Sequence, residues 1–205
     1  MQGLIARTLQ NFLQDTYGHS EWLDIAAYSG LEATEFEAML DYDIELVQAV
    51  LTCAETRLSK PPEVIFEDIG TYLVTHPNNE TLRRLLRYGG EDFFDFLHSL
   101  EDLPGRAQLA MADLRLPDLE LRDFSDNQFC LRCLCTERWM QGFGHVLVGV
   151  LRSMADDYGA LVLLDHRGRH AGTELIDITV IEMDYAEGRD FQLGGPTDRK
   201  RGVAS

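Results

Sequence analysis

The chain has few basic residues, few cysteines and no long apolar run. It carries 18 Lys and Arg against 35 Asp and Glu, which gives a net charge of −17. A charge of this sign repels nucleic-acid phosphates and anionic lipid headgroups. No stretch approaches the ~18 consecutive apolar residues that a membrane-spanning helix needs. We therefore predict a cytoplasmic protein that binds neither nucleic acid nor membrane.

Motifs of catalysis are also missing. The sequence contains no glycine-rich phosphate loop, no nucleophile elbow and no HExxH pattern. The chain has four cysteines, and three of them fall within residues 130–135. A chain of 205 residues with 45% apolar content forms a core without disulfides, so we expect reduced thiols. Nothing in the composition indicates an enzyme.

The apolar residues of the first half recur every three to four positions, which is the period of amphipathic helices. Ser20, Asp43 and Asn78 are candidate helix caps, and Pro61 and Pro62 are typical of a helix start. The predicted helices are 3–18, 20–30, 43–58, 61–76 and 78–90, with a further helix at 142–158.

After Pro117 the apolar period changes to two, as in half-buried strands. Strands are predicted around 119–121, 129–135, 160–165 and 176–180. The fold class is therefore α+β: a helical N-terminal half, a small antiparallel sheet of about four strands, and a packed C-terminal helix. We expect a single domain over 1–190, in which residues 1–112 are helical and residues 113–190 contain the sheet. The polar tail 191–205 is predicted to be disordered.

The segment FFDFLHSLEDLP contains one histidine, His98, and ends on Pro104. At about 100° per residue, Pro104 falls in the middle of the apolar stripe, whereas His98 falls near the polar edge. A lone histidine on a polar edge has no second ligand beside it. We therefore predict that His98 is solvated and binds neither a metal nor a cofactor.

The run CLRCLC, followed by His145, raises a zinc or thiol-switch alternative. Alternation along a strand places Cys133 and Cys135 on one face and Cys130 on the other. Three ligands then do not converge, so we predict packed, reduced thiols without a metal. His98, Cys133, Cys135 and His145 remain the weak metal candidates.

Several stretches, in order, resemble the heme nitric oxide/oxygen binding (H-NOX) family, which is related to the β subunit of soluble guanylate cyclase. MQGLIARTLQNFLQDTYG looks like the family's first helix, and YDIELVQAV and FEDIGTYLV look like its middle helices. FFDFLHSLEDL is similar to its proximal helix, LRLPDLEL to the entry into the sheet, and GFGHVLVGVLRSMADDYG to the C-terminal helix. The likeness spans about residues 1–165.

The resemblance implies a heme held by a histidine in a pattern close to L-D-x-L-H. Here that pattern reads LEDLP, so the ligand position is Pro104, which offers no imidazole. A second family pattern, Tyr-x-Ser-x-Arg, holds the heme propionates. It matches Leu134-x-Thr136-x-Arg138 if two residues are inserted before GFGH, or Thr136-x-Arg138-x-Met140 without the insertion. Thr136 and Arg138 are therefore the matched propionate positions, and Ile5 matches an apolar pocket position.

By this resemblance the function is that of a cytosolic sensory or regulatory domain that docks on a signalling protein, such as a histidine kinase or a cyclic-di-GMP enzyme. Heme is the implied cofactor, and the substitution at Pro104 argues against it. Two alternatives stay open. One is a heme-free module that binds a protein or a small apolar ligand, and the other is a thiol or zinc redox switch.

Overall fold

The N-terminal half is helical, as its apolar period predicts. The computed structural model describes residues 1–31, 34–112 and 114–189. The predicted tail 191–205 lies outside the described residues. The helices of this half are α1 (Gly3–Tyr17), α2 (His19–Ser29), α3 (Ile44–Leu58), α4 (Pro62–Thr75), the 3₁₀ turn η1 (Pro77–Asn79), α5 (Glu80–Arg87), α6 (Phe93–His98), the 3₁₀ turn η2 (Ser99–Asp102) and α7 (Leu103–Ala110).

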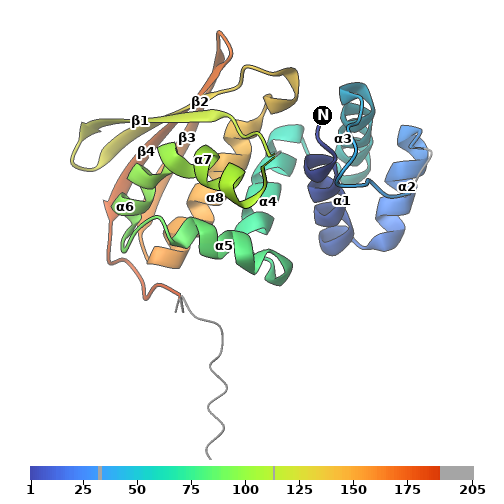
Figure 1. Cartoon of the computed structure of the whole chain (residues 1–205). Helices are drawn as coiled ribbons and strands as arrows, with labels where there is room; N and C mark the ends of the chain where they lie inside the picture. Colours follow the sequence, from blue (N-terminus) through green and yellow to red (C-terminus); the bar gives the residue numbers. More distant parts are fainter. Residues whose placement is uncertain (32–33, 113, 190–205) are drawn as a thin grey trace, which may run out of the picture.

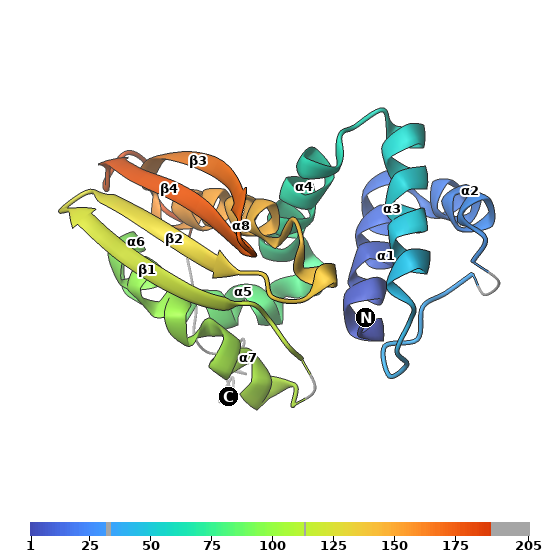
Figure 2. The same cartoon turned by 90° about the horizontal axis from the view of Figure 1, so that it is seen from above.

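A four-stranded antiparallel sheet follows, and it confirms the predicted change of period. Its strands are β1 (Asp118–Ser125), β2 (Gln128–Leu134), β3 (Leu161–His170) and β4 (Thr173–Glu182), in the order β1-β2-β4-β3. Between β2 and β3 the chain forms the short turn η3 (Arg138–Met140) and the long helix α8 (Phe143–Tyr158). The register places Leu121, Leu131, Ile176 and His166 in one row across the sheet. Its buried face packs against α8 and α6 (Figures 1 and 2).

Two predicted helix starts were wrong, and at a third the position is right but the expected capping hydrogen bond is not made. α2 begins at His19 after Gly18, so Ser20 lies inside the helix. Asp43 occupies the N-cap position of α3, but its side chain makes no capping hydrogen bond. The segment expected to begin a helix at Asn78 is instead the turn η1 followed by α5. The sequence pattern predicts where a helix lies, but the first residue of a helix varies by one or two positions and is predicted less well.

The segment 93–110 is not the single helix that the wheel assumed. α6 ends at His98, η2 forms one 3₁₀ turn, and α7 starts at Leu103. Pro104 stands in the first turn of α7, where its missing N–H costs least. Because proline cannot donate to the carbonyl four residues earlier, α-helical bonding does not continue through this point.

The core consists of two apolar clusters. One joins α1, α2, α3 and one side of α4, and the other joins the sheet, α6, α7 and α8. α4 and α8 cross between them at two glycines. A Cβ added to Gly70 would lie 2.0 Å from the Val146 carbonyl oxygen, and one added to Gly149 would lie 2.0 Å from that of Glu67. Figures 1 and 2 show α1 to α3 on one side of this crossing and the sheet on the other.

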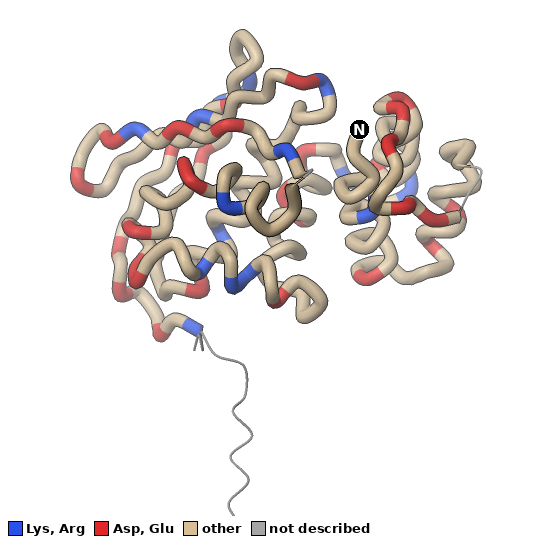
Figure 3. Tube along the Cα trace, in the orientation of Figure 1, with Lys and Arg blue, Asp and Glu red and all other residues tan. Residues whose placement is uncertain are grey.

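Acidic residues are distributed over both halves of the molecule (Figure 3). Basic residues pair with many of them, as Arg57 does with Glu21 and Asp24. Among the described residues, no helix combines the length and apolar character needed to cross a membrane.

Candidate functional site

His98 and Pro104 take the positions that the helical wheel predicts. Pro104 is buried in the first turn of α7, beside buried Leu103 and Leu100. The His98 side chain is 54% exposed, with its Nε2 4.0 Å from Asp123 Oδ2 and its ring against Phe129. The histidine thus faces the edge of the sheet, and the proline faces the interior.

The matched propionate positions lie on the loop after β2. Thr136 is exposed. The Arg138 guanidinium donates to Glu45 Oε1 at 2.8 Å and to Gln48 Oε1 at 3.2 Å, both on α3. This arginine therefore links the loop to the N-terminal helices. Ile5, on α1, is partly buried.

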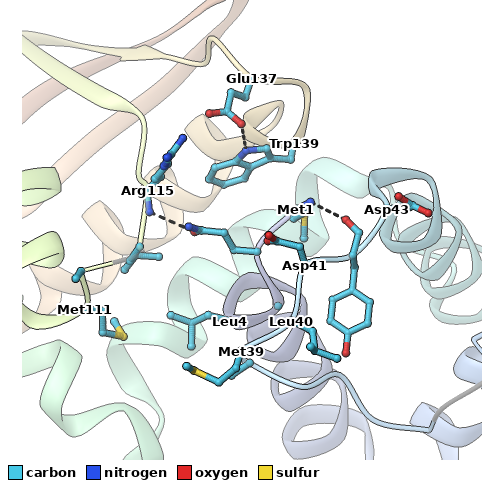
Figure 4. A pocket seen from close by; sticks show the side chains of 16 residues that line it. Met1, Leu4, Met39, Leu40, Asp41, Asp43, Met111, Arg115, Glu137 and Trp139 are labelled. Carbon is cyan, nitrogen blue, oxygen red and sulfur yellow. Dashed lines mark hydrogen bonds between the residues drawn. The ribbon is translucent and has the colours of Figure 1, made fainter.

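A cleft of about 940 Å³ opens between the N-terminal helices and the rest of the molecule (Figure 4). Its volume lies in the range of small-molecule sites, about 300–1,000 Å³. It is lined by Met1, Gln2, Gly3, Leu4, Ala38, Met39, Leu40, Asp41, Tyr42, Asp43, Met111, Ala112, Leu114, Arg115, Glu137 and Trp139. No sequence pattern predicted this cleft, because its walls come from segments that are far apart along the chain.

The cleft has an apolar floor and a polar rim. Figure 4 shows Met39 and Met111 approaching from opposite walls, with Leu4 between them. Met39 is 91% exposed. On the rim, the Trp139 indole N–H donates to Glu137 Oε2 at 2.7 Å, and the Arg115 backbone N–H donates to Gln2 Oε1 at 3.2 Å. Methionine side chains are flexible and polarizable, so such a floor adapts to apolar occupants of different shape.

None of the family-matched positions lines the cleft. Leu4 lines the cleft, whereas the adjacent Ile5 does not. In the loop after β2, Glu137 and Trp139 line the cleft, whereas Thr136 and Arg138 do not. Pro104 is buried on α7 and is not among the lining residues. The cleft residues include no histidine and no cysteine.

The cysteines pack as the strand alternation predicts. Cys133 and Cys135 are fully buried with their Sγ atoms 3.5 Å apart, whereas Cys130 contacts Asp177 on the other face. A hydrogen bond with Cys135, followed by burial, raises the pKa of the Cys133 thiol. Burial and the contact with Asp177 raise the pKa of Cys130. Over residues 1–31, 34–112 and 114–189, no group of three or more His, Cys, Asp or Glu side chains is arranged to hold a metal ion.

The order of elements and the sequence pattern together identify the family. A model of the family described as Haem-NO-binding matches residues 2–166. The chain belongs to the Haem-NO-binding family. The resemblance seen in the sequence is thereby confirmed, as is the interpretation of the chain as a sensor domain rather than a catalyst.

Relatives of this Haem-NO-binding domain include soluble guanylate cyclase gcy-31 of Caenorhabditis elegans. It is 22% identical over 157 residues, which are 77% of this chain and 22% of that protein. The chain thus spans about a fifth of the curated relative that it matches.

Solved structures show the same fold. An H-NOX protein from S. oneidensis in the Fe(II)NO state has a TM-score of 0.70 at 17% identity, covering 88% of this chain and 99% of that one. The Fe(II) unliganded H-NOX protein from K. algicida has a TM-score of 0.70 at 15% identity, covering 94% and 100%. At these identities the likeness establishes the fold, and the α+β prediction is confirmed.

Proposed function

We propose that the chain is a cytosolic sensory or regulatory domain of the Haem-NO-binding family that transmits a signal to a protein partner, with a degenerate heme site. Membership of the family supports the sensory role. The observation that supports a degenerate heme site is Pro104, buried on α7 at the position matched to the family's axial histidine.

The residues present do not fit a heme held in the family's manner. A proline nitrogen is a tertiary amide and has no lone pair for iron, and His98 faces Asp123 at the surface. Arg138, matched to a propionate partner, is engaged by Glu45. The cleft offers thioethers, but in heme proteins a methionine ligand normally stands opposite a histidine. We therefore propose that gas binding to an axially ligated heme is not the signal.

A visible absorption spectrum of protein purified from heme-supplemented cells tests this proposal. We expect no sharp Soret band for the wild-type chain and a band near equimolar heme for Pro104→His. The matched control is Gln108→His, which adds an imidazole at an exposed position of the same helix. Circular dichroism verifies that each variant is folded.

Two results would contradict the proposal. One is a sharp, equimolar Soret band in the wild-type protein that disappears in His98→Ala. The other is a folded Pro104→His variant that takes up no more heme than Gln108→His, since position 104 would then not be the axial position.

A heme-free binding module is the second candidate function, and the cleft favours it. Its exposed methionines and its volume suit a small apolar molecule or an apolar protein segment. Trp139 lines the cleft, whereas the only other tryptophan, Trp22, is fully buried. A change in tryptophan fluorescence on adding an apolar ligand, lost in Trp139→Phe, would support this candidate.

The class of partner is proposed from the family resemblance. A histidine kinase or a cyclic-di-GMP enzyme would receive the signal, and the relative named soluble guanylate cyclase indicates that such domains also occur within nucleotide cyclases. Change of the partner's activity on adding the purified domain would support this arrangement.

The thiol or zinc switch is the weakest candidate. The Sγ–Sγ distance of 3.5 Å brings Cys133 and Cys135 together. The raised pKa of Cys133, however, disfavours the thiolate that binds metals and reacts with oxidants. Stoichiometric zinc in the purified protein, lost in Cys133→Ser, would favour this candidate over the others.

A further inference from the structure

The cleft carries apolar side chains that the described part of the chain leaves largely uncovered. Met39 is 91% exposed, Leu40 51% and Met111 44%, and all three line the cleft. Figure 4 shows Met39 and Met111 on opposite walls. A pocket for a small ligand normally encloses it and buries about 70–90% of its surface. A side chain as exposed as Met39 instead belongs to a surface that a larger partner covers from outside.

The rim of the cleft is acidic. The lining contains three acidic side chains, Asp41, Asp43 and Glu137, and one basic side chain, Arg115. Figure 4 shows Arg115 on the wall opposite Asp41 and Asp43. Both aspartates are exposed, and neither forms an ion pair with a described residue. This wall, on a chain with a net charge of −17, attracts a cationic partner and repels an anionic one.

The wall formed by residues 1–3 and 40–42 has backbone hydrogen bonds of its own. The two segments pair as an antiparallel bridge. The Gly3 N–H donates to the Leu40 carbonyl at 2.7 Å, and the Tyr42 N–H donates to the Met1 carbonyl at 2.9 Å. A docking strand needs unpaired backbone groups with which to extend a ladder. A helix needs none, because its own backbone groups are paired internally, so the wall suits a helix better than a strand.

We propose that the cleft is the docking site for a basic amphipathic helix of a partner protein. The apolar face of the helix covers Met39, Leu40 and Met111, and its lysines or arginines face Asp41 and Asp43. Because methionine side chains are flexible, the apolar floor repacks around helices of different sequence. The inference rests on the second candidate function, the heme-free binding module, and names the occupant of its cleft.

A synthetic helix of lysine and leucine tests the proposal with the full chain. The peptide has about 18 residues, with leucines on one face and lysines on the other, and no tryptophan. Trp139 lines the cleft and Trp22 is fully buried, so a change in tryptophan fluorescence reports docking. We expect the change to saturate at one peptide per chain and to be absent in Trp139→Phe.

Two double variants, each of which removes two negative charges, test the electrostatic part. Asp41→Asn, Asp43→Asn removes them at the rim and should weaken peptide binding about threefold or more, through the loss of two exposed ion pairs. Asparagine suits the N-cap position of α3 as well as aspartate does.

The matched control is Asp123→Asn, Asp126→Asn, at the end of the sheet where β1 turns into β2. Figures 1 and 2 place this turn far from the N-terminus, and so from the cleft wall that Met1 helps to form. The control should change the affinity by less than about twofold, because the Debye length is about 8 Å at ~0.15 M salt.

Two variants of one residue test the apolar part. Met39→Gln keeps the length of an exposed side chain but not its apolar character, and should weaken peptide binding about tenfold. Met39→Leu stays apolar and should bind within about threefold of the wild type. A peptide of the same composition, with its leucines scattered around the helix, should also bind more weakly.

The neutral apolar dye Nile red separates this inference from the candidate function on which it rests. If the dye binds the wild type and not Met39→Gln, whereas the peptide does not bind, the binding module stands and the helical partner is wrong. If neither binds, both are wrong. Equal weakening in the two double variants would show that the peptide follows the net charge rather than the cleft, and it would overturn the proposal. Equal binding of the scattered peptide would overturn it as well.

Discussion

At the scale of single residues, the contact between α4 and α8 depends on two missing side chains. A Cβ at Gly149 would lie 2.0 Å from the Glu67 carbonyl oxygen and 2.9 Å from the Thr71 nitrogen, and both are backbone atoms that cannot rotate away. Gly149→Ala should therefore lower the free energy of unfolding by about 1–3 kcal/mol, the range of overpacked cores. Urea denaturation of the two proteins measures this difference.

Gly105→Ala is the matched control. Gly105 is also helical, in α7, but an added Cβ there meets nothing within 4 Å. Alanine in an open helical position stabilises by up to about 1 kcal/mol relative to glycine. Equal losses in the two variants would show that helix propensity, rather than the crossing of α4 and α8, decides the result.

At the scale of elements, the sequence predicted the type of nearly every helix and strand. Side chains return to the same face every 3.6 residues in a helix and every two residues in a strand, so burial of one face leaves that period in the apolar residues. The prediction failed where one residue competes with the pattern. Pro104 continues the apolar stripe yet divides the helix into α6, η2 and α7. Glu174 stands in phase with Ile176, Ile178 and Val180 and is buried with them, although acidic side chains are seldom fully buried.

The sites were harder to predict than the elements. Strand alternation placed Cys133 and Cys135 together because the two are neighbours on one strand. The cleft was not predicted, since Met39, Met111 and Trp139 come from segments far apart along the chain that meet only in the folded molecule. The apolar period of a helix or strand gives no information on contacts between segments that are far apart in the sequence. The same holds for the stacking of His145 on His166, which joins α8 to β3.

The end of β2 gives a pH-dependent prediction. The hydrogen bond with Cys135, followed by burial, raises the pKa of Cys133 above the ordinary thiol value of 9.0. Below that value both the folded and the unfolded chain hold the thiol proton. As the pH rises past it, the unfolded chain loses the proton and the folded chain keeps it, so the free energy of unfolding falls.

Urea denaturation under reducing conditions, from about pH 7.5 to about pH 10, measures this fall. Cys133→Ala is expected to be less stable at neutral pH, because it leaves a cavity, and to lose less stability as the pH rises. Cys130, Tyr72 and Tyr158 also have raised pKa values and contribute to the slope in both proteins, so the difference between the slopes isolates Cys133. If the free energy of unfolding fell equally with pH in the wild type and in Cys133→Ala, the raised pKa of Cys133 would not be the cause of the fall.

At the scale of the whole molecule, the two apolar clusters meet at the crossing of α4 and α8, and polar contacts also join the N-terminal helices to the segments on either side of β1 and β2. Arg138 reaches Glu45 and Gln48, and the Arg115 backbone N–H donates to Gln2 Oε1. A cleft therefore remains between the halves beside a closely packed crossing. This combination suits a domain in which an event at one half is passed to the other through α4 and α8.

The net charge of −17 acts on this arrangement as a whole. Like charges repel more strongly in the compact folded chain than in the expanded one, so the charge opposes folding. The Debye length falls from about 30 Å at ~0.01 M salt to about 8 Å at ~0.15 M, which screens repulsion between distant carboxylates. Most ion pairs here are at least partly solvent-exposed, and each stabilises the fold by only about 0–1 kcal/mol. Salt therefore removes less stabilisation by screening the ion pairs than destabilisation by screening the repulsion between carboxylates.

We therefore expect the midpoint of thermal unfolding to rise between these two salt concentrations. The exposed acids Asp41 and Asp43 on the cleft wall allow a charge-matched comparison. The double variant Asp41→Lys, Asp43→Lys is less negative and should respond less to salt, whereas Asp41→Glu, Asp43→Glu keeps the charge and should respond as the wild type does. A midpoint that falls with salt in all three proteins would show that the ion pairs, and not the net charge, dominate the electrostatic free energy of folding.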